Sequence, residues 1–220
     1  MAGWNFDEIR RSFEADLARG RASGARAHKR SRILAAATEA FVAHGYRKTS
    51  VEEVARAAGV AKGTIYLYFK TKADMLMAAL DVERRRYAAE ILPLFREEVE
   101  PRERLRGYVE RTLRLAAELP LFSRLQGGDR ELLMVLDELD TSIRSRTLEV
   151  GMDLLVRLID DAASPHTWSP SELRDRATVL MGILLAGGGR DEVARLEMAP
   201  NRFARVLAEV IVDGLAGKPH

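Results

Sequence analysis

The stretch AAGVAKGTIYLYFKTK, residues 57–72, decides the fold of this chain and raises the question of its function. Tyr66, Tyr68 and Phe69 lie within four positions of one another, and lysines stand on both sides of them. Aromatic side chains at this density usually belong to a core, whereas lysines are almost never fully buried. The mixture indicates a short element with one buried face and one face turned to a partner.

A helix that begins near Ala61 separates these side chains into two groups. Ile65 and Phe69 are four residues apart and face the core, while Thr64 and Tyr68 lie on the opposite side. The tyrosines combine an apolar ring with a polar tip, so they can present their hydroxyl groups outward. The outward face is therefore suited to recognition.

The residues before this helix predict two more helices. A helical pattern of apolar residues starts at Ser31 and stops at Gly45. Ser50 is followed three residues later by Glu53, which is the spacing of a capping box, and Gly59 ends that second helix. Two short helices joined by such a turn form a helix-turn-helix.

The composition of the third helix suits the major groove of DNA. A helix in that groove offers side chains to base edges, while lysines, hydroxyls and backbone N–H groups hold phosphates. Gly63 allows close approach of the backbone, and Thr64 offers both a hydroxyl and a methyl group. Residues 1–72 hold 14 Lys and Arg against 7 Asp and Glu, whereas the rest of the chain holds 21 against 26. This asymmetry predicts a polyanion-binding module in the first third.

Residues 29–76 resemble the TetR/AcrR family of bacterial transcriptional regulators. The resemblance is carried by three adjoining segments, RSRILAAATEAFVAHGY, TSVEEVARAAGV and AKGTIYLYFKTKADML. No single piece of this pattern is specific, but the combination at these spacings is.

The resemblance implies an all-α homodimer with an N-terminal three-helix DNA-binding domain and a C-terminal helical bundle that binds a ligand and dimerises. The family's DNA contacts carry over to Thr49, Ser50, Lys62, Gly63, Thr64, Tyr66, Leu67, Tyr68 and Lys72. Among them, Lys72 matches a lysine that commonly binds phosphate. Two positions depart from the family: Ala61 replaces the usual capping residue, and Leu67 replaces a polar or aromatic group.

Alternative interpretations of these residues stay open. Lys62 and Lys72 are solvated lysines in one interpretation and phosphate ligands in the other. Tyr66 and Tyr68 either face DNA or lie half-buried within the domain. The basic residues of the N-terminal arm either aid solubility or reach the minor groove, and they are Arg21, Arg26, Lys29, Arg30 and Arg32.

The chain divides into three parts at the level of sequence. Residues 1–27 form an extension with an amphipathic helix up to residue 20 and a flexible basic arm over 20–30, residues 28–72 form the DNA-binding domain, and residues 73–220 form the regulatory domain. Helices are expected from Lys72 towards Pro93, from Pro101, from Pro120, over 129–162, over 171–186 and over 200–215. Period-two alternation long enough for a strand is absent from the sequence.

The C-terminal part predicts a ligand pocket and a dimer interface. Candidate pocket residues are large and apolar or adaptable, and they are Tyr108, Phe122, Met134, Met152, Trp168 and Met181. Plain core filling explains the same residues. The resemblance assigns the homodimer interface to helices 171–186 and 200–215, which carry Val179, Leu180, Ile183, Leu184, Phe203, Val206, Leu207, Val210 and Ile211. These ridges serve the monomer core in the alternative.

Other classes of function lack support in the sequence. There is no cysteine, and the four histidines are scattered, so neither a metal site nor a cofactor is predicted. The sequence has no nucleophile elbow, no phosphate-binding loop and no concentrated set of acid, base and nucleophile, so the protein is not expected to be an enzyme. No run approaches the length of a membrane span, and a cytoplasmic protein without a membrane partner is expected.

The expected function is sequence-specific binding to a palindromic double-stranded DNA operator, with release by a small apolar effector. An activator, a nucleoid-type binder without an effector, and a regulator controlled by a protein partner are the alternatives.

Overall fold

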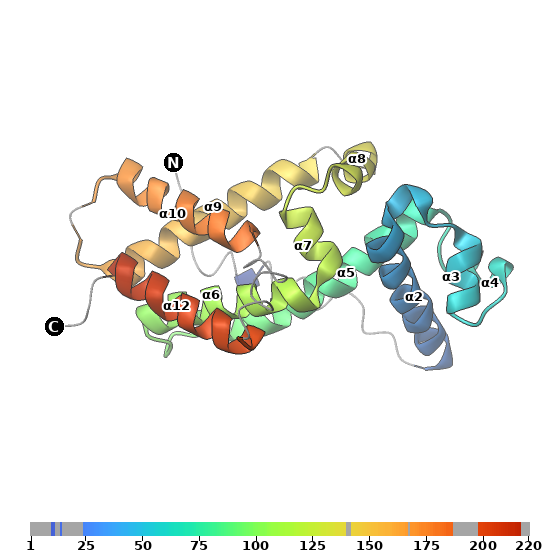
Figure 1. The fold of residues 1–220 in the computed structure, drawn as a ribbon, viewed down its shortest axis with the longest axis horizontal. Coiled ribbons are helices and arrows are strands. Elements are labelled where there is room, and N and C mark those ends of the chain that lie inside the picture. Colours follow the sequence, from blue (N-terminus) through green and yellow to red (C-terminus); the bar gives the residue numbers. More distant parts are fainter. Residues whose placement is uncertain are drawn as a thin grey trace.

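The computed structural model describes residues 10, 11, 14, 24–139, 142–166, 168–186 and 198–216. All regular secondary structure in this part of the chain is helical, which confirms the all-α prediction. Figure 1 shows an elongated molecule, with the helices around residues 25–66 at one end and the last helices at the other. The predicted helix of residues 1–20 lies almost wholly outside the described residues.

Three helices build the N-terminal end, and they are α2 (Ala25–Lys48), α3 (Val51–Ala57) and α4 (Lys62–Tyr66). Gly45 interrupts α2 with φ 79° and ψ 167°, so the predicted stop is a real break in the backbone. The capping box of Ser50 and Glu53 is present, as predicted. Gly59 has φ 63°, a conformation that favours glycine, and it turns the chain between α3 and α4.

The basic arm is where the sequence prediction was wrong. Residues 25–30 belong to α2 and are not a flexible segment. Alanine, arginine and lysine are good helix formers, so this run extends the first helix backwards. Arg30 lies over the ring of Phe69 at 5.4 Å and Arg32 donates a 2.5 Å hydrogen bond to the carbonyl of Ala58. Arg21 lies outside the described residues.

The remaining elements follow the predicted order, and they are α5 (Lys72–Ile91), η1 (Leu92–Phe95), α6 (Pro101–Glu118), α7 (Pro120–Gln126), α8 (Arg130–Leu139), α9 (Ser142–Ala163), α10 (Pro170–Leu185) and α12 (Pro200–Ala216). The segment 129–162, predicted as one piece, forms the two helices α8 and α9. Of the described helices, none has the length and apolar character needed to cross a bilayer.

Two hydrophobic cores organise these helices, and α5 runs through both. Met75 to Leu80 pack with α2, α3 and α4, whereas Tyr87 and Ile91 pack with α6, α9, α10 and α12. The short helices α7 and α8 add Leu121, Leu132 and neighbouring side chains to the first core. The boundary between the cores thus falls inside α5, and movement of α7 or α8 would be felt in the N-terminal domain.

Candidate DNA interface and effector cavity

The helix α4 is held from behind by apolar packing. Ile65 is 1% exposed and Phe69 is 4% exposed, and both belong to the first core. Ala61 provides no side-chain cap, as expected for an alanine in place of the usual capping residue. A five-residue helix is marginal alone, and these anchors stabilise it.

The opposite side of α4 is open. Tyr66 is 49% exposed and Leu67 is 74% exposed, which is unusual for large apolar side chains. A Cβ added at Gly63 would meet no protein atom within 4 Å. Packing within the described protein therefore does not require glycine at this position.

Leu67 and Tyr68 follow α4 in a turn, although both were assigned to the recognition helix. Their N–H groups donate to the carbonyls of Thr64 and Ile65, which keeps them continuous with the helical backbone. Tyr68 is only half-exposed, because its ring packs against Phe69 at 6.4 Å and beneath the Arg26 guanidinium at 5.8 Å. Thr64 is also half-exposed.

Lys62 forms an exposed ion pair across the turn. Its ammonium contacts the carboxylate of Glu52 on α3. The hydrogen bond from Lys62 lowers the pKa of Glu52, and the same bond raises the pKa of Lys62. Because both groups are solvent-exposed, a phosphate can compete for this lysine.

Lys72, for which a phosphate contact is predicted, bonds to the protein itself in this structure. Its Nζ donates to the carbonyls of Tyr46, Arg47 and Thr49, at 2.7, 3.3 and 3.0 Å. It also lies 4.3 Å from the centroid of the Tyr46 ring. An ammonium has three donors, so all of them are committed to the end of α2. In this structure Lys72 ties α5 to α2 and has no donor left for phosphate.

Thr49 is likewise a structural residue. Its side chain is 2% exposed, and its hydroxyl bonds the carbonyls of Ala40 at 3.1 Å and Gly45 at 2.7 Å. Burial withdraws this hydroxyl from the surface, and the DNA contact predicted at Thr49 stays a prediction. Ser50 differs, since its Oγ accepts from the Glu53 N–H while the side chain stays partly exposed.

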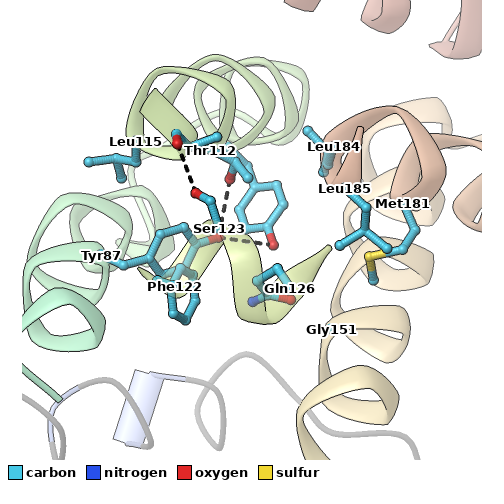
Figure 2. Close-up of a pocket in the computed structure, with 12 residues that line it drawn as sticks. Tyr87, Thr112, Leu115, Phe122, Ser123, Gln126, Gly151, Met181, Leu184 and Leu185 are labelled. Atoms are coloured by element: carbon cyan, nitrogen blue, oxygen red, sulfur yellow. Dashed lines mark hydrogen bonds between the residues drawn. The ribbon is translucent and has the colours of Figure 1, made fainter. Parts of the chain in front are cut away.

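A cavity of about 80 Å³ lies between α5, α6, α7, α9 and α10 (Figure 2). Its lining combines three hydroxyl-bearing residues of α5 and α6 with apolar side chains of α7 and α10. The residues are Tyr87, Tyr108, Thr112, Leu115, Ala116, Phe122, Ser123, Gln126, Gly151, Met181, Leu184 and Leu185. Three predicted pocket residues, Tyr108, Phe122 and Met181, line it.

The other three predicted pocket residues lie elsewhere. Met134 is 51% exposed on α8, and Met152 packs against the second core. The ring of Trp168 packs against two neighbouring side chains. It stacks on His166 with the ring centroids 4.7 Å apart, and the Arg176 guanidinium lies 3.9 Å from its centroid. None of the three lines the cavity, so their assignment to it was wrong.

The sequence analysis did not predict that Tyr87 and Thr112 join Tyr108 in lining this cavity. Tyr87 donates a 3.3 Å hydrogen bond to the Tyr108 hydroxyl and lies 3.1 Å from Oγ1 of Thr112. Burial raises the pKa of both phenols, so they stay protonated at neutral pH. Tyr108 and Thr112 are four residues apart on α6, and this spacing places them on one face of the helix. Tyr87 joins them only through the packing of α5.

A chain of polar contacts links this cavity to the DNA-binding domain. Glu83 on α5 is 6% exposed, and its carboxylate accepts a 2.7 Å hydrogen bond from the N–H of Phe122, at the start of α7. At the other end of α7, Arg124 donates to the carbonyls of Phe41 and Val42 in α2, at 3.2 and 3.3 Å. One face of α7 thus lines the cavity while its two ends hold α5 and α2.

A second contact meets the break in α2. Glu131 of α8 accepts a 2.5 Å hydrogen bond from the backbone N–H of Arg47. Its other carboxylate oxygen would lie 2.7 Å from a Cβ added at Gly45, so a side chain there would displace Glu131 in addition to straining the backbone at φ 79°. Both α7 and α8 therefore bind the same end of α2.

The predicted dimer helices divide their residues between core and surface. Leu180 and Leu184 are buried in the second core, so their assignment to a partner-facing surface was wrong. Val179 is 64% exposed and Val210 is 65% exposed. Val206 is 37% exposed, and the half-buried members are Ile183, Phe203, Leu207 and Ile211.

Comparison with known proteins identifies the N-terminal domain. A model of bacterial regulatory proteins of the tetR family matches residues 33–79. The fatty acid metabolism regulator protein of Bacillus subtilis is 48% identical over 50 residues, which cover 23% of this chain and 26% of the relative. The transcriptional activator FasR of Mycolicibacterium smegmatis is 33% identical over 85 residues, 39% of each chain. The transcriptional regulator RutR of Escherichia coli K12 is 32% identical over 108 residues, which cover 48% of this chain and 50% of the relative.

These matches span half or less of each relative, whereas the fold is shared over nearly the whole length. A TetR-like transcriptional regulator from Rhodococcus sp. RHA1 superposes with a TM-score of 0.65 at 24% identity, over 86% of this chain and 97% of that one. The regulator FadR from Bacillus subtilis, solved in complex with stearoyl-CoA, superposes with a TM-score of 0.60 at 20% identity. The superposition covers 86% of this chain and 99% of that one. Residues 33–79 thus match the tetR family of bacterial regulatory proteins, and nearly the whole chain shares the fold of the two solved regulators.

Proposed function

We propose that this protein is a homodimeric transcriptional repressor that binds a palindromic operator and is released by a small, largely apolar ligand. It acts in the cytoplasm, without enzymatic activity. The observation that carries the proposal is the α4 surface, where Gly63, Tyr66 and Leu67 are open to solvent above the buried Ile65 and Phe69. A rigid helix with an exposed reading face is what major-groove recognition requires.

The dimer forms through α10 and α12. Val179 and Val210 are large apolar side chains that are about two-thirds exposed, on the two helices that the family resemblance assigns to the interface. Exposed apolar surface of this kind marks interaction sites. A two-fold dimer sets the spacing of its two reading heads, which matches a palindromic operator.

The ligand acts through α7. Because Phe122 lines the cavity and its N–H is bonded to Glu83, a ligand that displaces this side chain strains the start of α7. Movement of α7 is passed to α2 by Arg124, and so to the orientation of α4. The ligand changes DNA affinity only to the extent that it binds the two arrangements unequally.

Activation of transcription is the second candidate. The relative FasR, similar over 39% of this chain, is named a transcriptional activator. The DNA-binding surface is the same in both cases, and the position of the operator relative to the promoter decides the sign.

The test begins with selection of bound fragments from genomic DNA, followed by fluorescence anisotropy on the selected site at several salt concentrations. Leu67→Ala should weaken specific binding at least roughly 5-fold while leaving the unfolding midpoint unchanged, because this side chain is 74% exposed. Met134→Ala, an apolar truncation at a 51% exposed position of α8, serves as the control and should bind as wild type. Equal binding by both variants would contradict recognition through α4, and a footprint over the promoter separates repression from activation.

A further inference from the structure

The cavity has a polar wall and an adaptable wall. Tyr87, Tyr108 and Thr112 form the polar one, with their hydroxyl oxygens 3.1 to 3.3 Å apart along the chain of bonds. Figure 2 shows Met181, Leu184 and Leu185 on the opposite side, with Phe122 and Gln126 of α7 below. None of the twelve described residues that line the cavity is charged.

The polar wall has one donor to spare. Tyr87 donates to Tyr108, and the bond between Tyr87 and Thr112 uses a second hydroxyl proton. With Tyr87 donating to Tyr108 and Thr112 donating to Tyr87, the proton of the Tyr108 hydroxyl, on a side chain 6% exposed, can turn from its neighbour Thr112 to an acceptor in the cavity. A buried donor gains a full hydrogen bond from an acceptor that enters the cavity, because no bulk water competes there.

The lining also sets the charge of the occupant. A carboxylate or phosphate brought against this wall loses its hydration and finds no cation among the lining residues, which is strongly unfavourable. A carbonyl oxygen loses less hydration and is satisfied by a single donor. The wall therefore favours a neutral acceptor over an anion.

Size adds a second constraint. Sites for drug-sized ligands hold roughly 300–1,000 Å³, whereas this cavity measures about 80 Å³. A larger occupant requires the cavity to expand, and Met181, a half-buried side chain of the adaptable wall, is the lining residue best able to move. Methionine changes rotamer easily, so a compact apolar body is accommodated there.

We propose that the effector of this regulator presents an uncharged carbonyl to the Tyr108 hydroxyl and a compact apolar body to Met181 and Phe122. This inference rests on the proposed function, since it names the ligand class of the same cavity. The carbonyl belongs either to a free ketone or ester or to the thioester of a larger carrier, since both offer the same acceptor.

The test uses three soluble probes of matched shape, which are acetophenone, ethylbenzene and benzoate, titrated calorimetrically at pH 8 into the full-length protein without DNA. Acetophenone should bind more tightly than ethylbenzene by roughly 5-fold, the worth of one hydrogen bond, and benzoate more weakly than either. In Tyr108→Phe the preference for acetophenone over ethylbenzene should disappear while ethylbenzene binding is kept. Thr112→Val, which removes a hydroxyl without the proposed ligand bond, should retain most of that preference.

Three results would overturn the inference: tighter binding of benzoate than of acetophenone, an unchanged preference in Tyr108→Phe, or no binding of any probe at millimolar concentration. If Tyr108→Phe does not fold, the order of the three probes on wild type still decides. Methyl benzoate and benzoyl-CoA then separate the two sources of the carbonyl, because they carry the same compact acyl group on a small uncharged carrier and on a large charged one. Ligand binding is measured without DNA, so a probe that binds as expected but leaves operator binding intact would refute release by ligand and not this ligand class.

Discussion

The ammonium of Lys72 donates a 2.7 Å hydrogen bond to the carbonyl of Tyr46 and lies 4.3 Å from the centroid of that residue's ring. The two residues are 26 positions apart, and they join the first turn of α5 to the last turn of α2. The break at Gly45 lies just before these carbonyls, and carbonyls at the end of a helix need partners from elsewhere. Lys72 supplies them, so a residue that resembles a DNA contact acts here as a clamp between helices.

Lys72→Met should therefore destabilise the protein by about 1–3 kcal/mol, because three carbonyls lose their donor. Urea unfolding followed by circular dichroism measures this loss. Lys70→Met, at an exposed neighbouring lysine, should stay within about 0.5 kcal/mol of wild type. If Lys72→Met kept full stability and lost DNA binding, the lysine would be a phosphate ligand after all.

Lys62 should behave as a phosphate contact that Glu52 partly occupies. Lys62→Ala is expected to reduce the slope of log affinity against log salt by about one, since one cation leaves the interface. Glu52→Gln should increase that slope and tighten binding, because it frees Lys62 from its ion pair. Anisotropy titrations over a salt series measure both slopes. Equal slopes for wild type and Lys62→Ala would show that this lysine stays with Glu52 when DNA binds.

Local patterns in the sequence were sufficient for much of the fold. The capping box of Ser50 and Glu53 and the break at Gly45 depend on residues within a few positions, and both were predicted correctly. The partner of Arg32, the Ala58 carbonyl, is 26 residues away. Such a contact leaves no periodic pattern in the sequence, so Arg32 was grouped with the basic residues of the arm.

The candidate site shows the same division. Exposure of Leu67 and burial of Ile65 follow from helical spacing, whereas burial of Thr49 depends on the packing of α2 against α3. In the cavity, Tyr108 was predicted and Tyr87 was not, because Tyr87 meets it only where α5 crosses α6. Met134 and Trp168 have the apolar side chains expected of pocket residues, but Met134 is exposed on α8, and Trp168, which precedes α10, packs against Arg176.

The buried carboxyl of Glu83 predicts a dependence of stability on pH. Burial raises its pKa above the ordinary 4.5, and the N–H groups of Phe122 and Leu121 offset only part of this. The folded state therefore binds this proton more tightly than the unfolded chain, and its contribution to stability falls as pH rises from about 4.5 through the folded pKa. Glu83→Gln keeps an acceptor for Phe122 and removes that loss.

Urea unfolding of wild type and Glu83→Gln at pH 7.5, 6 and 5 checks this expectation. The Gln variant should be at least as stable as wild type at pH 7.5, and the difference should narrow as pH falls. Glu83→Ala should be less stable than Glu83→Gln by about 1 kcal/mol at pH 7.5, because the start of α7 loses its cap. Glu97→Gln, at an exposed carboxyl, should show no such trend. A stability difference between Glu83→Gln and wild type that is independent of pH would contradict a raised pKa.

The faces of α10 and α12 predict the effect of a charge at the dimer interface. Val179→Asp and Val210→Asp should each weaken self-association at least roughly 10-fold, because an unpaired carboxylate would be buried between the protomers. Each variant should keep the helical content of wild type, since both valines are about two-thirds exposed in the monomer. Val82→Asp, the same change at a 42% exposed valine of α5, should leave association unaffected.

Sedimentation velocity over a concentration series measures the dissociation constant of the dimer. Operator binding should be lost in parallel, because one reading head alone covers only a half-site. If Val179→Asp and Val210→Asp remained dimeric while Val82→Asp dissociated, the interface would lie on α5 instead.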